Sequence, residues 1–151
     1  MGENSDLVHI KTSKITNAGD GLFTLKKINE GDFICWYIGC YVDKAMVING
    51  YYDSDYLFTC RGGKLVIDAA DPLSCFGRYA NDSLSKRKTN CKFVTYENSF
   101  AAALIATKNI RKGAEVYVTY GSVFWLEPHR FNKLSASDKA FVENYDNEEI
   151  Y

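Results

Sequence analysis

The sequence predicts a single, mostly β domain that ends with a short helix. Three observations support this prediction. Aromatic residues are abundant, with 11 Tyr, 9 Phe and 2 Trp among 151 residues, and aromatic side chains favour strands. Only two prolines occur, and glycines separate short apolar runs, as they do where short strands are joined by turns. One stretch near the C-terminus has apolar residues at helical spacing, and the chain length is that of one domain.

Seven runs rich in aromatic and β-branched residues are expected to be strands. They are Gly21–Lys26, Phe33–Ile38, Tyr56–Thr59, Leu65–Asp68, Cys91–Tyr96, Phe100–Thr107 and Glu115–Tyr120. The glycine-containing stretches 30–32, 61–63 and 111–113 are expected to be turns. Ser135 or Ser137 can cap a helix near 136–145, and the segment 126–151 is expected to pack on a domain formed by residues 1–125.

Two parts of the chain resemble each other. Leu22–Gly39 aligns with Leu104–Gly121, so that leucine, lysine, isoleucine and both glycines fall at matching positions. Each part reads as a strand, a glycine turn and a second strand. The similarity predicts two related β-units that fold against each other, and a chance likeness of two short hairpins is the alternative.

Charge and cysteine content exclude several classes of function. The net charge is −1, so we expect no overall basic field and no direct binding of nucleic acid. The run Lys86–Lys88 is either a solvated loop or a contact for an acidic partner. The five cysteines form no C-x-x-C pair and most of them lie far from the two histidines, which predicts no zinc or other metal site. The odd number of cysteines favours reduced thiols and so an intracellular protein. The sequence has no apolar run of transmembrane length, so we expect no membrane contact.

Four motifs follow one another along the chain. They are Ala18–Phe23, then Asp55–Phe58 with Val66–Ala69, then Gly77–Ser83 with Thr89–Phe93, and finally Gly113–Gly121. In this order and spacing they resemble the SET domain of protein-lysine methyltransferases, and the resemblance covers roughly Val8 to Trp125. A structural β-protein with the same motifs would require four coincidences.

The resemblance implies a fold of several small β-sheets with a C-terminal pseudoknot, in which Gly77–Ser83 passes under a loop of the C-terminal segment. Gly77–Ser83 and Val118–Phe124 would then be neighbours in space. It also implies an enzyme that transfers a methyl group from S-adenosylmethionine to a lysine of a protein or peptide. Histone tails are the common targets of the family, which would place the protein in the nucleus, and another substrate would place it in the cytoplasm.

The residue types suit this reaction. Freeing the amine of a lysine with a pKa near 10.4 costs about 4 kcal/mol at neutral pH. A nearby sulfonium cation and burial both lower that pKa, so no strong side-chain base is needed. Alignment of the reacting atoms and aromatic walls for the lysine stem are needed instead.

The resemblance assigns roles residue by residue. Tyr120 matches the catalytic tyrosine of the family. Tyr56, Phe93 and Val118 match positions that contact the substrate lysine, although the last two also suit a core. The methyl donor is expected to contact Ala18, Gly19, Asp20, Tyr56, Arg78, Asn81, Asp82 and Trp125. For Arg78 a structural ion pair is equally compatible with the sequence.

The sequence departs from the family at several points. The usual Asn-His-Ser-Cys is here Asn81–Leu84, with Asp82 in place of the histidine, and no cysteine-rich zinc segment is present. Phe124 and Trp125, or the stretch 126–131, would have to cover the adenine. Asp82 also supports an alternative, a catalytically inactive SET-like module that binds a peptide or protein. Because neither Phe93 nor Val118 carries a hydroxyl, an active enzyme is expected to add more than one methyl.

Overall fold

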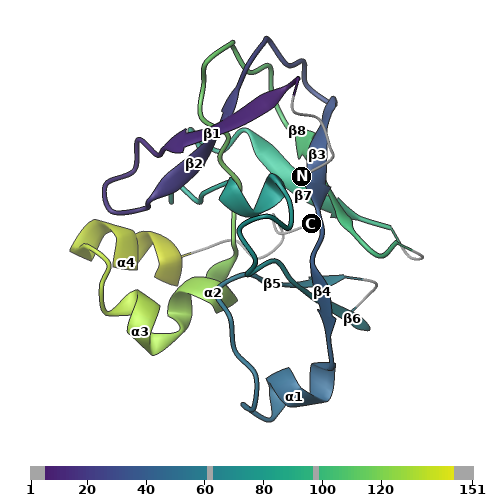
Figure 1. Cartoon of the computed structure of the whole chain (residues 1–151). Coiled ribbons are helices and arrows are strands. Elements are labelled where there is room, and N and C mark those ends of the chain that lie inside the picture. Colours follow the sequence, from purple (N-terminus) through teal and green to yellow (C-terminus); the bar gives the residue numbers. More distant parts are fainter. Residues whose placement is uncertain (1–5, 61–62, 97–98, 145–151) are drawn as a thin grey trace.

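The computed structural model describes residues 6–60, 63–96 and 99–144. Their strands form three small antiparallel sheets, which lie one above the other in Figure 1 with the helices at one side and at the lower end. The strands are β1 (Val8–Thr12), β2 (Asp20–Thr24), β3 (Phe33–Tyr37), β4 (Cys40–Val42), β5 (Leu57–Cys60), β6 (Leu65–Asp68), β7 (Cys91–Thr95) and β8 (Ala102–Ala106). The helical elements are α1 (Lys44–Ile48), the 3-10 turn η1 (Gly77–Tyr79), α2 (Ser122–Leu126), α3 (Pro128–Phe131) and α4 (Ala136–Glu143).

The sheets join distant parts of the chain. β1 pairs with β2, β8 lies between β3 and β7, and β6 lies between β4 and β5. The prediction of a mostly β fold with several small sheets is confirmed. The predicted turns 30–32 and 111–113 are observed, with Gly31 and Gly113 at positive φ. The prediction for 61–63 falls partly outside the described residues, because 61 and 62 are not described.

The sequence did not predict β1, β4 or the short helical elements before residue 136. Helix α1 shows why, because none of its residues is buried and no apolar face marks it in the sequence. Its start depends on Asp43, whose side chain accepts a hydrogen bond from the N–H of Ala45 at 2.9 Å. Such a local cap stabilises a helix by about 1 kcal/mol without leaving a periodic pattern.

The prediction of a strand over Glu115–Tyr120 is wrong. Its main-chain donors bond to three different segments: Val116 to the carbonyl of Leu22 at 2.7 Å, Tyr117 to the side chain of Asn90 at 2.9 Å, and Val118 to the carbonyl of Asn81 at 2.9 Å. The segment therefore forms isolated bridges and no continuous ladder. The alternating apolar pattern that suggested a strand instead reflects Val116 and Val118 turning into the core, where both are 0% exposed.

The internal similarity corresponds to a real structural relation. The N–H of Gly31 donates to the carbonyl of Ala106 at 2.8 Å, and the N–H of its counterpart Gly113 donates to the carbonyl of Thr24 at 3.0 Å. Thr24 and Ala106 are themselves counterparts in the alignment. Ile28 and Ile110, a third matched pair, exchange hydrogen bonds of 2.9 and 2.8 Å. The reciprocal bonds show that two similar β-units do fold against each other.

Helix α4 is the predicted terminal helix. Ser135 caps it, because its hydroxyl accepts a hydrogen bond from the N–H of Asp138 at 3.1 Å. Val142 is buried, and the helix lies beside α2 in Figure 1. Residue 145, the predicted end, lies outside the described residues.

The main chain of η1 packs closely against that of β3. A Cβ added to Gly77 would lie 2.7 Å from the carbonyl oxygen of Trp36 on β3. No larger residue fits at this distance without moving the main chain. Gly77 therefore allows η1 to lie against β3, which fixes the start of the stretch that continues to Asn81.

Candidate active site

A groove of about 1360 Å³ lies where four segments of the chain meet. They are the loop before β2, the segment that enters β5, the turn η1 with the residues after it, and the part of the chain from 120 to 138. The predicted site residues that line this groove are Ala18, Gly19, Asp20, Tyr56, Arg78, Asn81, Asp82, Phe93, Tyr120 and Trp125. The fold therefore brings together residues that lie up to 107 positions apart, from 18 to 125.

Val118 is placed differently from the other predicted residues. Its side chain is 0% exposed and belongs to the core, and its N–H holds the carbonyl of Asn81 at 2.9 Å. The neighbouring Tyr117 would enter the site only after a one-residue shift. Instead, its hydroxyl donates to Glu115 at 2.8 Å. Burial is the main cause that raises the pKa of Tyr117, and the hydrogen bond to Glu115 raises it further.

Tyr120 lies where the segments Gly77–Ser83 and Val118–Phe124 meet. Its hydroxyl donates to the carbonyl of Ala80 at 2.8 Å and lies 3.4 Å from the amide oxygen of Asn81. Its ring stacks on Trp125, with centroids 5.9 Å apart and planes 20° apart, and meets the edge of Phe124 at 4.8 Å. The ring is therefore held on one side by α2 while the hydroxyl faces the 80–81 main chain.

Asn81 connects three parts of the site. Its side-chain amide donates to the carbonyl of Asp20 at 2.9 Å, and its own carbonyl accepts from Val118. The loop at Ala18–Asp20 is thereby tied to the C-terminal segment. Within that loop Gly19 has φ +72°, where a residue with a Cβ would be strained, and its position leaves the main chain open to the groove.

The carboxylate of Asp82 is buried and accepts three hydrogen bonds. One oxygen accepts from the N–H of Tyr120 at 2.9 Å and from the indole N–H of Trp125 at 2.9 Å. The other accepts from the N–H of Leu84 at 2.8 Å. Asp82 is only 7% exposed, so these bonds are shielded from solvent. One side chain thus joins the stretch after η1 to the tyrosine and to helix α2.

Arg78 and Tyr56 form one side of the groove together. The guanidinium of Arg78 lies 4.1 Å from the ring centroid of Tyr56 and 4.6 Å from that of Tyr79. It also donates to the carbonyl of Ala69 at 2.7 Å and to that of Ala70 at 3.3 Å. These contacts are with main-chain oxygens and aromatic faces, so Arg78 fixes the orientation of Tyr56.

Three rings build an aromatic wall, which consists of Tyr37, Phe58 and Phe93. Their centroids lie 5.2 to 5.5 Å from one another, mostly edge to face. The hydroxyl of Tyr37 donates to the carbonyl of Tyr56 at 2.6 Å, and burial raises the pKa of Tyr37. Sequence reasoning found Phe93 but missed the other two. The only signal was their place in predicted strands, which does not distinguish a groove from a core.

The last two helices before α4 close one end of the groove. The guanidinium of Arg130 on α3 lies 4.0 Å from the ring centroid of Phe124 and pairs with Asp55, before β5, at 2.6 Å. It also donates to the carbonyl of Phe124 at 3.2 Å. This ion pair ties the C-terminal helices to the opposite side of the groove. It was not predicted, because its partners lie 75 residues apart.

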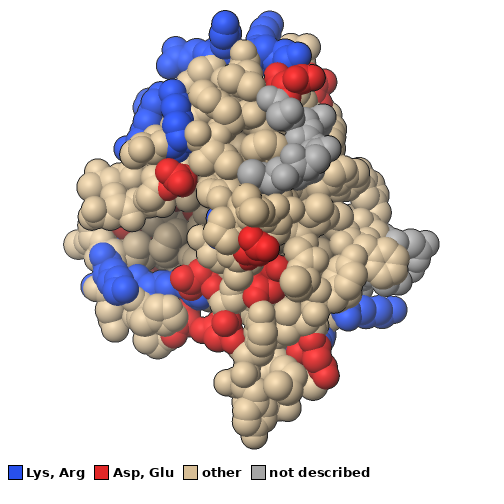
Figure 2. Space-filling model, viewed as in Figure 1, with Lys and Arg blue, Asp and Glu red and all other residues tan. Residues whose placement is uncertain are grey.

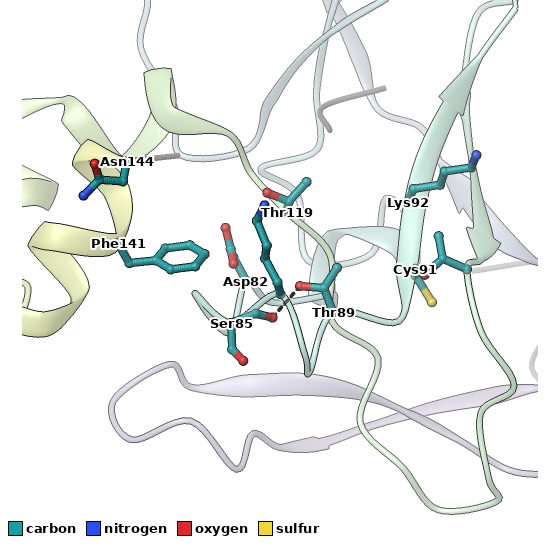
Figure 3. A pocket seen from close by; sticks show the side chains of 10 residues that line it. Asp82, Ser85, Thr89, Cys91, Lys92, Thr119, Phe141 and Asn144 are labelled. Atoms are coloured by element: carbon teal, nitrogen blue, oxygen red, sulfur yellow. Dashed lines mark hydrogen bonds between the residues drawn. The ribbon is translucent and has the colours of Figure 1, made fainter. Parts of the chain in front are cut away.

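Asp82 also borders a second, smaller cavity of about 280 Å³. Figure 3 shows Ser85 and Thr89 on one side of it, with the ring of Phe141 from α4 pointing toward Asp82. The hydroxyl of Thr89 donates to the carbonyl of Ser85 at 2.9 Å. The buried carboxylate therefore lies between the groove and this cavity.

The charges around the groove are unequal. Carboxylates line it at Asp20, Asp53, Asp55, Asp82, Glu127 and Asp138, whereas its Lys and Arg residues are Arg78, Arg130 and Lys133. A groove of this composition favours a cationic ligand. The described residues contain no group of three or more His, Cys, Asp or Glu side chains that could hold a metal ion. Among the same residues, no helix has both the length and the apolar composition needed to cross a membrane.

Comparison with known proteins identifies similar chains. The histone-lysine N-methyltransferase set-1 of Caenorhabditis elegans is 28% identical over 129 residues, which is 80% of this chain and 52% of that protein. The chain therefore spans about half the length of this curated relative.

Two solved structures have a similar fold: an active polycomb repressive complex 2 in its stimulated state, and the complex from Chaetomium thermophilum. Their TM-scores are 0.63 and 0.62 at 25% identity, and each match covers 76% of this chain and 15% of the other. The profile of the SET domain matches residues 19–121, which include the four motifs except for Ala18. With this match over more than half of its length, the chain belongs to the SET-domain family.

Proposed function

We propose that the chain is a protein-lysine N-methyltransferase that uses S-adenosylmethionine and acts on a histone in the nucleus. The observation that carries this proposal is the position of Tyr120, whose hydroxyl meets Ala80 and Asn81 beside an aromatic-lined groove. The name of the relative, a histone-lysine N-methyltransferase, supports the activity and the substrate class.

The groove suits the methyl donor in size and composition. Its volume exceeds the roughly 300–1000 Å³ of an ordinary ligand pocket, which leaves room for a donor and a lysine together. Gly19, Asn81, Phe124 and Trp125 line the groove, and we propose that the first two hold the amino-acid end of the donor and the last two cover its adenine. S-adenosylmethionine, when bound, supplies a methyl group on a sulfonium cation, and the acidic lining favours that charge.

The aromatic wall of Tyr37, Phe58 and Phe93 suits the stem of a lysine. Removal of water from an ammonium group lowers its pKa from about 10.4 and so makes the neutral, nucleophilic amine accessible. The hydroxyl of Tyr120 then orients that amine toward the methyl group. No residue has to act as a strong base, since alignment and desolvation supply the needed change.

We also propose that the enzyme adds at least two methyl groups. A wall that offers a free hydroxyl can hold the amine and an ordered water in an orientation that blocks further rounds. Phe93 has no hydroxyl, and the hydroxyl of Tyr37 is engaged by the carbonyl of Tyr56 at 2.6 Å. The wall is therefore mostly hydrocarbon and leaves space for a larger amine.

A second candidate is a catalytically inactive module that binds a peptide. Asp82 favours it, because the family usually has a histidine there. In the structure, however, the carboxylate of Asp82 holds Tyr120 and Trp125 in place. We therefore regard Asp82 as a replacement that keeps the site formed.

Calorimetry with S-adenosylmethionine, followed by a methylation assay on core histones and cell lysate read by mass spectrometry, tests the proposal. We expect the chain to bind the donor and to produce methylated lysine. In Tyr120→Phe the methylated lysine should be lost. Donor binding without any methylated product would favour the inactive module. Methylation of lysate proteins but not of histones would retain the activity and reject the histone substrate.

A further inference from the structure

The charges of this chain are unevenly distributed although its net charge is only −1. Between Asp82 and Glu115 the sequence has seven Lys and Arg residues and one acidic residue, Glu97. Figure 2 shows the same separation: most basic side chains gather at the upper end, near β1 and β2, and most acidic ones gather lower, around β5 and α2. The net charge of −1 predicted no binding of nucleic acid, but on this face it averages over a mainly basic upper end and a mainly acidic lower part.

Six of the basic residues form what we call the basic surface. They are Lys86, Arg87, Lys88, Lys108, Arg111 and Lys112, and all six are exposed. The ammonium of Lys108 donates to the carbonyl of Arg87 at 2.7 Å, which joins the turn 86–88 to the connection after β8. At the base of this junction the N–H of Thr107 donates to the carbonyl of Asn90 at 2.8 Å. The pairing of Ile110 with Ile28 brings the exposed Lys26 and Lys27 to its border.

The composition of this surface indicates its partner. Exposed ammonium and guanidinium groups bind phosphates and release the counterions around them. Binding to a membrane would need exposed apolar anchors, and binding to single strands would need exposed aromatic platforms. No large apolar or aromatic side chain is exposed in the described ranges 83–95 and 101–119. We propose that the basic surface binds the phosphate backbone of duplex DNA.

The basic surface and the groove are adjacent but separate. None of its six residues lines the groove, whereas Leu84, two positions before Lys86, does. DNA bound at this surface would leave the groove accessible to a lysine. Binding of DNA does not require methyl transfer, so this proposal and the proposed function can fail independently.

Fluorescence anisotropy with a labelled duplex DNA of mixed sequence tests the proposal on the full chain over a series of salt concentrations. Two double variants, Arg87→Ala/Lys88→Ala and Arg111→Ala/Lys112→Ala, each remove two charges from the basic surface. They spare Lys86, which borders the small cavity, and they leave intact the main-chain carbonyls that Arg87 and Arg111 offer. The matched control, Lys44→Ala/Lys64→Ala, removes two exposed charges elsewhere.

We expect each basic-surface variant to bind about tenfold or more weakly near 50 mM salt, with a salt slope smaller by about 0.9 for each phosphate that the variant no longer neutralises. The control should change affinity less than about twofold. Equal weakening in all three variants would mean that only net charge matters and would overturn the proposal. Absence of duplex binding, or equal or tighter binding of the matching single strand or of polyglutamate, would overturn it as well.

Discussion

Asp82 gives the sharpest test of the structure, because a single buried carboxylate holds three parts of the site. In Asp82→Ala the N–H groups of Tyr120, Trp125 and Leu84 are all left without their acceptor. A hydrogen bond to a charged group contributes about 1.5–3 kcal/mol, and a buried donor left without a partner carries its own penalty. Since bonds to one side chain are not additive, we expect a decrease of about 3–5 kcal/mol in the free energy of unfolding.

A matched control separates the local bond from the long-range ones. Asp71 accepts a hydrogen bond from the N–H of Leu73 at 2.9 Å, two residues on, as Asp82 does from Leu84. Asp71 is exposed and bonds within its own turn, so Asp71→Ala should cost less than about 1 kcal/mol. The difference between the two variants measures what the bonds to Tyr120 and Trp125 contribute.

Urea denaturation supplies the free energies, and calorimetry and turnover show whether the site stays formed. Asp82→Asn keeps one oxygen and should cost about 1–3 kcal/mol, because its amide group faces at least one of the three donors. It should also reduce turnover more than donor affinity, since the position of Tyr120 is what changes. Equal destabilisation by Asp82→Ala and Asp71→Ala would refute the reasoning.

Four further outcomes are expected. Tyr120→Phe should cost only about 1 kcal/mol of stability and keep donor binding, as measured by calorimetry, while turnover falls at least about a hundredfold. Phe93→Tyr should shift the product toward monomethyl-lysine, as read by intact-mass spectrometry of a single-lysine peptide; an unchanged product would reject the role of Phe93. Burial raises the pKa of Tyr37, so folding favours its neutral form. The free energy of unfolding should therefore keep its full value below about pH 10 and decrease above it. In Tyr37→Phe this decrease should be less steep. Iodoacetamide should label the native chain mainly at Cys40, the exposed thiol, and all five cysteines in denaturant; fast labelling of a buried thiol would contradict the core.

The sequence predicted those parts of the fold whose stability comes from regular pairing. Strands such as β6 and β7 were found because apolar and β-branched residues in a short run suit a ladder whatever its partner is. The internal similarity was also informative, since matched residues such as Gly31 and Gly113 occupy matched places in the structure. By contrast, α1 and the helices that close the groove depend on caps and on the Arg130–Asp55 pair, which leave no periodic pattern in the sequence.

The resemblance predicted that Gly77–Ser83 lies beside Val118–Phe124, as it does in the structure, but it did not predict the contacts that hold the two segments together. The central residues of the site lie on segments without regular structure, the stretch around Asn81 and the stretch that ends at Tyr120, and each segment bonds to several partners instead of one. Periodicity therefore assigned Glu115–Tyr120 to a strand, whereas the segment forms only isolated bridges. For Asp82 the sequence offered only a missing histidine, whereas the structure supplies its three partners. A residue that seemed to argue against catalysis from its identity alone argues, from its contacts, for a site that is held in place.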